Sequence, residues 1–121
     1  MTITAIETIT IPVSDQEAAL SFYRDVLGFE VTADNAYGDA RWLTVAPVGS
    51  SINFVLHLPF DGEVPGWQKG VVLGSDDIEA DCARLVSSGV SVSGPDTVGW
   101  GLQAQFSDPD GNGFVLLQQG V

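Results

Sequence analysis

The chain has few basic residues. Its 121 residues contain 4 Lys and Arg against 16 Asp and Glu, which gives a formal net charge of −12 at pH 7. Nucleic-acid binding needs clustered Lys and Arg to neutralise phosphates, and anionic membrane surfaces attract the same residues. The composition therefore argues against a nucleic-acid partner and against a membrane partner. It is compatible with a cationic small ligand, although solubility alone also accounts for it.

Cysteine is also scarce, and long apolar runs are missing. Cys82 is the one cysteine, so no disulfide can form within the chain, which favours a reducing compartment. Its spacing from Ile78 and Leu85 predicts a buried packing role in a helix rather than a nucleophile. No apolar run approaches the about 18 residues of a membrane span, and no basic region precedes an apolar run at the start. We therefore expect a cytoplasmic protein without a membrane segment.

The first part of the chain has the pattern strand, helix and three strands. Apolar and polar residues alternate over residues 3–13, which is typical of a strand. The apolar residues that follow have helical spacing. Gly28 comes where a helix needs a left-handed C-terminal residue. Residues 35–39 are typical of a turn, and 59–68 are rich in Pro and Gly and typical of a linker. The three strands after the helix are expected at residues 29–32, 41–46 and 52–58.

The second part repeats this pattern. A strand is expected at 71–73, a helix from Asp76 or Asp77 to about residue 88, and strands at 90–92, 102–106 and 114–118, with a loop at 94–99. Matching residues recur at one constant offset: Asp15 and Asp76, Ala19 and Ala80, Gly28 and Gly89, Val31 and Val92. The sequence therefore predicts a single domain, 1–121, built from a duplicated βαβββ unit, with modules at 1–58 and 69–121 and a linker at 59–68.

The stretch Asp108-Pro109-Asp110-Gly111-Asn112, followed by the apolar run Phe114-Val115-Leu116-Leu117, predicts strand, tight turn and strand. It resembles the last hairpin of the vicinal oxygen chelate superfamily, which includes glyoxalase I, extradiol dioxygenases, and fosfomycin- and bleomycin-resistance proteins. Val13-Ser14-Asp15 and Asp76-Asp77-Ile78 resemble the starts of its two modules. The resemblance implies an α+β fold, in which two βαβββ modules form a curved mixed sheet with helices on the outer face. It also implies a ligand cavity on the concave face and a homodimer.

The resemblance also places four metal-ligand positions, and this chain has no ligand at any of them. The residues there are Thr8, Val55, Gly70 and Val115. Dioxygenase and glyoxalase chemistry needs imidazoles and carboxylates to hold a divalent ion. We therefore expect no metal and no cofactor.

The sole histidine, His57, falls on an expected strand. Alternation places Asn53, Val55 and His57 on one face, and the more apolar set of Phe54, Leu56 and Leu58 on the other. His57 should then point into the cavity. No orienting partner is evident in the sequence, so hydrogen bonding in the cavity wall is favoured over catalysis, and no catalytic residue is assigned.

Aromatic residues supply the remaining ligand evidence. Trp42, Trp67 and Phe60 can line a pocket rim, and Trp67 and Phe60 can equally pack at a dimer interface. Trp100 lies between two glycines, which favours a ligand contact. The expected ligand-binding residues are Thr8, Thr10, Asn53, Val55, His57, Trp100, Val115 and Leu117.

These features favour metal-independent binding of a small organic molecule, a neutral or cationic aromatic or apolar compound. The resemblance to bleomycin-resistance proteins suggests drug sequestration. One alternative is a lyase, isomerase or hydrolase that uses His57 or a pocket carboxylate. Another is a dimeric interaction module without small-molecule function.

Overall fold

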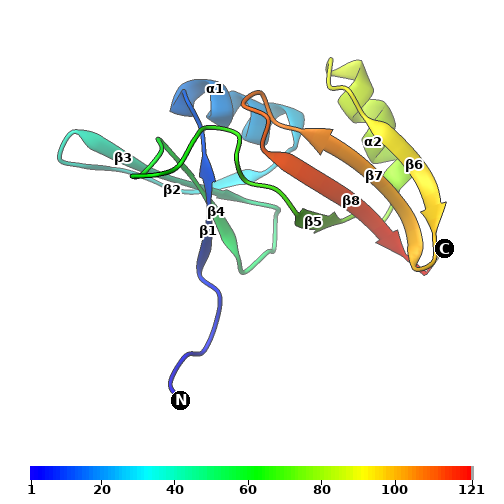
Figure 1. Cartoon of the computed structure of the whole chain (residues 1–121), viewed down its shortest axis with the longest axis horizontal. Helices are drawn as coiled ribbons and strands as arrows, with labels where there is room; N and C mark the ends of the chain where they lie inside the picture. Colours follow the sequence, from blue (N-terminus) through cyan, green and yellow to red (C-terminus); the bar gives the residue numbers. More distant parts are fainter. Residues whose placement is uncertain (121) are drawn as a thin grey trace. The chain divides into compact units, whose positions relative to one another are not determined.

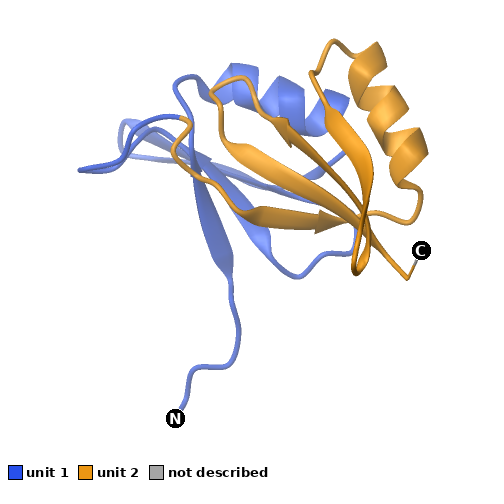
Figure 2. Ribbon diagram, turned by 45° about the vertical axis from the view of Figure 1, so that its right-hand side comes forward, with its two compact units in different colours: residues 1–65 blue, residues 66–121 orange. Residues whose placement is uncertain are grey.

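The computed structural model describes residues 1–120 and divides into two compact units, residues 1–65 and residues 66–121 (Figure 2). Each unit has its own four-stranded sheet and its own helical segment. No helix within residues 1–120 has the length and apolar character needed to cross a membrane.

The first unit is a mixed sheet with one helical segment (Figure 1). The strand order is β1-β4-β3-β2, with β1 parallel to β4 and the other neighbours antiparallel. Its elements are β1 (Thr8–Pro12), α1 (Gln16–Ser21), η1 (Phe22–Val26), β2 (Glu30–Tyr37), β3 (Ala40–Ala46) and β4 (Asn53–His57).

The helical segment of this unit begins and ends where the sequence predicted. The Asp15 side chain accepts hydrogen bonds from the backbone N–H groups of Glu17 and Ala18, and Gly28 follows the segment with φ 74°. The α-helix ends at Ser21, however, and the chain continues as one π-helical turn. Phe22 and Tyr23, adjacent in that turn, are both buried, so the wide turn accompanies two consecutive core rings.

The second unit repeats the topology of the first. Its strand order is β5-β8-β7-β6, with β5 parallel to β8. Its elements are β5 (Val71–Gly74), α2 (Ile78–Ser87), β6 (Ser93–Val98), β7 (Gly101–Ser107) and β8 (Gly113–Gln119). The α+β fold of two mixed βαβββ modules is therefore confirmed.

The core of the second unit lies on one side of its sheet. Ile78, Cys82 and Leu85 of α2 are buried, and the rings of Phe106 and Phe114 stack with centroids 5.5 Å apart. Cys82 is 5% exposed, and burial raises the pKa of its thiol, which confirms the packing role predicted for it.

The final hairpin has the turn that its residues predicted. Gly111 has φ 97°, in the left-handed region. The buried Asp108 carboxylate accepts hydrogen bonds from the backbone N–H groups of Asp110 and Asn112, and from the Asn112 amide at 2.8 Å. Asn112 in turn accepts a hydrogen bond from the backbone N–H of Gln68 at 3.1 Å, which ties the start of the unit to the hairpin.

Three element boundaries differ from the sequence prediction. The first strand is shorter than residues 3–13, and β2 continues through Asn35 to Tyr37, so the turn is confined to residues 38–39. The strand expected at 90–92 lies instead at Ser93–Val98, where residues 94–99 suggested a loop. Pairing with β7 holds this Gly- and Pro-containing segment in the sheet, and β6 is an edge strand, where proline is tolerated.

Candidate functional site

The two faces of the first sheet differ in what covers them. Phe54 packs toward the helical segment, because its ring lies 6.1 Å from Phe29, which lies 6.0 Å from Tyr23 of η1. Side chains alternate along β4, so Asn53, Val55 and His57 lie on the opposite face.

The strand register places four of the predicted site residues beside one another on this opposite face. Thr8 pairs with Asn53, and Thr10 pairs with Val55. Thr8 is exposed, Thr10 and Asn53 are half-buried, and Val55 is buried. His57, two residues beyond Val55, lies on the face that alternation predicted.

Three aromatic rings gather around the His57 imidazole on this face. The aromatic cluster consists of Tyr37, Trp42, His57 and Phe60. Phe60 stacks almost parallel to the imidazole, with centroids 4.4 Å apart and 14° between the planes. Tyr37 and Trp42 lie 6.0 and 6.3 Å from the imidazole and 6.4 Å from each other. One end of the sheet therefore has a continuous aromatic wall.

Two hydrogen bonds orient the imidazole. Nδ1 lies 2.7 Å from the carbonyl oxygen of Leu58, and the Tyr37 hydroxyl contacts Nε2. A carbonyl oxygen only accepts, so Nδ1 carries the proton in the neutral ring, and Nε2 accepts from the Tyr37 O–H. Since His57 is 8% exposed, this arrangement satisfies both of its nitrogens away from water.

The outer rings of the aromatic cluster remain available to solvent. Tyr37 is 46% exposed and Phe60 is 47% exposed, whereas Trp42 is half-buried. Partly exposed rings held by buried neighbours offer flat apolar area with little mobility to lose on binding. The cluster can therefore stack against a planar group.

Every basic side chain of the chain is already engaged. Arg41 contacts the carboxylates of Asp34 and Glu17, and its hydrogen bonds hold the pKa of Asp34 below the usual range. The remaining pairs are Arg24 with Asp25 at 2.8 Å, Arg84 with Asp81 at 3.7 Å, and Lys69 with the Gly111 carbonyl. The three arginines are therefore paired with carboxylates, whereas the partner of Lys69 is a neutral carbonyl oxygen.

The predicted site residues of the second unit lie on the face of its sheet away from the buried core. Val115 pairs with Gln105 and Leu117 pairs with Gln103, whereas Phe114 and Leu116 are buried on the core side. Both Val115 and Leu117 are half-buried. Trp100 lies at the tip of the β6–β7 hairpin, 62% exposed, and stacks on no other ring within residues 1–120.

The four positions at which the superfamily's metal enzymes carry ligands do not suit a metal here. Thr8 lies on β1 and Val55 on β4, Gly70 precedes β5, and Val115 lies on β8. Together they supply no imidazole or carboxylate, and no three His, Cys, Asp or Glu side chains of residues 1–120 form a group that could hold a metal ion.

Sequence reasoning did not name Tyr37 as a site residue. Residues 35–39 were expected to be a turn, and a turn residue has no defined face. The usable signal was that Tyr37 continues the alternation of Ala33 and Asn35. It therefore lies on the same face as Thr44 and Trp42, the cross-strand partners of those two residues.

Comparisons with known proteins agree with this architecture. A sequence model of the Glyoxalase/Bleomycin resistance protein/Dioxygenase superfamily matches residues 5–116. The crystal structure of TnmS3, an antibiotic binding protein from Streptomyces sp. CB03234, is 46% identical, covers 99% of both chains and has a TM-score of 0.95. A glyoxalase/bleomycin resistance protein from the same strain is also 46% identical, with 94% of this chain and all of that chain covered and a TM-score of 0.86. The uncharacterized protein YetH of Bacillus subtilis (strain 168) is 33% identical over 116 residues, which span 93% of this chain and 97% of YetH. The chain therefore belongs to the glyoxalase/bleomycin resistance protein/dioxygenase superfamily.

Proposed function

We propose that this protein binds a small organic molecule with a planar aromatic body, without a metal, on the aromatic cluster of the first unit. The observation that carries the proposal is the His57–Phe60 stack, which lies beside Trp42 and the exposed Tyr37 ring. Flat apolar walls with a few fixed polar groups are the usual composition of a small-molecule site.

The polar groups beside the cluster would orient the ligand. The Tyr37 oxygen keeps a free lone pair after its hydroxyl donates to His57, and Thr10 and Asn53 lie on the same sheet face. A ligand with a ring system and one or two hydrogen-bond donors suits this arrangement.

The charge distribution favours neutral or cationic ligands. The chain has a net charge of −12, and its four basic side chains are all engaged. An anionic ligand would approach against the long-range field of the chain.

Similarity to TnmS3, described as an antibiotic binding protein, supports sequestration as the biological use of such binding. A sequestering protein needs affinity and no turnover. This fits a site in which the two nitrogens of the sole histidine are already satisfied by Tyr37 and Leu58.

The test is calorimetric titration of the full chain with three compounds that share one ring system: 1-naphthylmethylammonium, 1-naphthylmethanol and 1-naphthylacetate. We expect the cation and the alcohol to bind more tightly than the acetate. Phe60→Leu should weaken binding of the cation by about 0.5–1.5 kcal/mol, the contribution of an aromatic pair beyond its buried area. Phe60→Tyr keeps the stacked ring and is the matched control.

Two results would contradict the proposal. One is tightest binding of the acetate. The other is equal affinity of Phe60→Leu and the parent chain for every compound that binds, because the stack would then make no contact with the ligand.

We also propose that the chain forms a homodimer. Apolar residues of the linker are exposed, and aromatic residues are enriched at protein interfaces: Val64 is 64% exposed and Trp67 is 59% exposed. Light scattering at micromolar concentration should give twice the 12.7 kDa chain mass, and the mass of one chain would contradict the proposal.

A further inference from the structure

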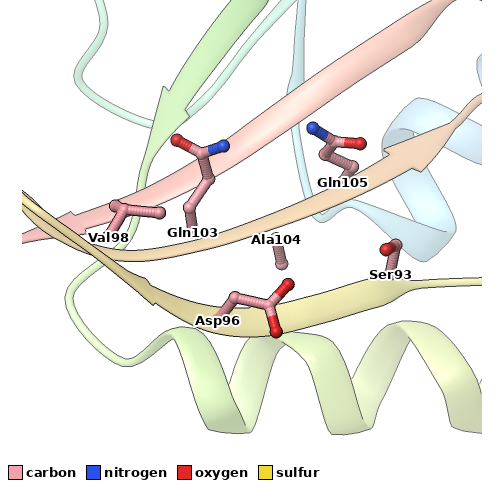
Figure 3. Close-up of a pocket in the computed structure, with 6 residues that line it drawn as sticks. All are labelled: Ser93, Asp96, Val98, Gln103, Ala104 and Gln105. Atoms are coloured by element: carbon pink, nitrogen blue, oxygen red, sulfur yellow. The ribbon is translucent and has the colours of Figure 1, made fainter.

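The second unit has a pocket between β6 and β7, which are antiparallel neighbours in its sheet. The β6–β7 pocket has a volume of about 110 Å³. Its lining residues are Ser93, Asp96, Val98, Gln103, Ala104 and Gln105. Figure 3 shows Gln103 and Gln105 projecting from one side of β7 and Ala104 from the other, with Asp96 and Ser93 on the facing strand.

A β-bulge creates the space between the strands. Ser93 pairs with Gln105 and Asp96 pairs with Gln103, so β6 has one more residue than β7 over this interval. Gly94 lies in the bulge with φ 103°, and a Cβ there would lie 2.8 Å from the Gln103 carbonyl oxygen. The two backbones approach so closely at this point that only glycine fits. The residue at position 94 is therefore suited to the bulge.

The polar side chains of the pocket face solvent: those of Ser93, Asp96 and Gln105 are exposed, and that of Gln103 is half-buried. Within residues 1–120, the side chains of Ser93, Asp96, Gln103 and Gln105 make no hydrogen bond or ion pair. Other polar side chains of this unit are engaged: the Gln118 amide oxygen accepts from the Ile78 N–H at 2.8 Å, and Ser75 donates to Asp81 at 2.6 Å.

All four free groups present acceptor oxygens, and one of them is anionic. The Asp96 carboxylate only accepts, the two glutamine amides each offer a carbonyl oxygen, and the Ser93 hydroxyl offers lone pairs. No basic residue lines the pocket. The glutamine amides and the serine hydroxyl can also donate, so the Asp96 carboxylate decides the choice, and a cation with N–H donors complements it.

The volume limits the size of that group. A pocket of about 110 Å³ has room for a small group such as a guanidinium or an aminomethyl group. A planar guanidinium can pair with a carboxylate through two parallel hydrogen bonds.

We propose that the β6–β7 pocket binds a small N–H-bearing cation, a guanidinium or primary ammonium group, through Asp96, Gln103 and Gln105. This site belongs to the second unit and does not rest on the aromatic cluster.

The experiment is an NMR titration of the ¹⁵N-labelled full chain with methylguanidinium, which fits the pocket. We expect saturable shifts of the side-chain amide signals of Gln103 and Gln105. Tetramethylammonium has the same charge and no N–H donor, and should leave these signals unchanged at the same concentration and ionic strength. Urea has N–H donors and no charge, and should bind at least about tenfold more weakly, because it lacks the positive charge that pairs with the Asp96 carboxylate.

Matched variants assign the effect to one carboxylate. Asp96→Asn should weaken methylguanidinium binding about tenfold or more, whereas Asp76→Asn, the same charge change at an exposed residue outside the pocket, should leave it unchanged. Two results would overturn the proposal: equal responses to methylguanidinium and tetramethylammonium, or equal loss of binding in the two variants. Either result would show that methylguanidinium responds only to the overall negative charge of the chain and not to this pocket.

Discussion

The hydroxyl of Tyr37 donates to Nε2 of His57 in the neutral ring, while Nδ1 of the same ring donates to the carbonyl of the next residue, Leu58. The tyrosine comes from the end of β2 and the histidine from the end of β4, so this bond joins two strands that are not neighbours in the sheet. It also decides which nitrogen of His57 has the proton.

We predict that neutral His57 is protonated at Nδ1. A ¹⁵N NMR spectrum at about pH 8.5, where an ordinary histidine is neutral, should show the Nδ1–H tautomer. Tyr37→Phe keeps the ring and removes the donor, and should lower the free energy of unfolding by about 0.5–1.5 kcal/mol in urea denaturation. An Nε2–H tautomer in the parent chain would show that the two hydrogen bonds are arranged differently.

Gly111 should resist substitution because of its backbone conformation alone. Its φ is 97°, and a Cβ would meet no atom within 4 Å, so strain is the only cost of a side chain. We expect Gly111→Ala to lower the free energy of unfolding by about 1–2 kcal/mol in chemical denaturation. Gly99→Ala is the control, because Gly99 also has open space and no positive φ. Equal stability of the two variants would show that the final turn relaxes around the new side chain.

Trp100 should offer a stacking surface of its own on the second unit. The indole is 62% exposed between two glycines and has little packing of its own. Trp100→Ala should weaken binding of 1-naphthylmethylammonium to the chain by about 1–3 kcal/mol in calorimetry, with little change in melting temperature. Unchanged affinity would contradict a role for Trp100 in ligand binding.

The purified chain should bind no stoichiometric divalent metal. The side chains at the superfamily's ligand positions, Thr8, Val55, Gly70 and Val115, cannot coordinate zinc, nickel, manganese or iron. Elemental analysis after dialysis should find far less than one metal ion per chain. About one ion per chain that survives a chelator would mean that other residues form a site.

The sequence predicts the fold well because duplication constrains it. Asp15 caps the first helix, and Gly28 and Gly89 follow the two helical segments with positive φ, as the repeat predicts. The cap of the second helix is Asp77, one residue beyond the repeat partner Asp76. The family resemblance drawn from the final hairpin is confirmed as well.

What the sequence could not supply were features decided by pairing between strands. β6 has weak strand propensity and exists because β7 holds it, so its place was missed by local reasoning. Tyr37 was missed for a related reason, since only its position in β2 places it beside Trp42 and His57. Both candidate sites depend on these non-local contacts.

The shared strand order of the two sheets has a consequence for protein engineering. Tyr37, Trp42 and His57 come from β2, β3 and β4, whereas the β6–β7 pocket is lined by later strands of the other unit. A mutant library confined to either set of strands would vary one recognition surface and leave every lining residue of the other untouched. Two specificities could thus be selected in separate rounds and then combined in one gene.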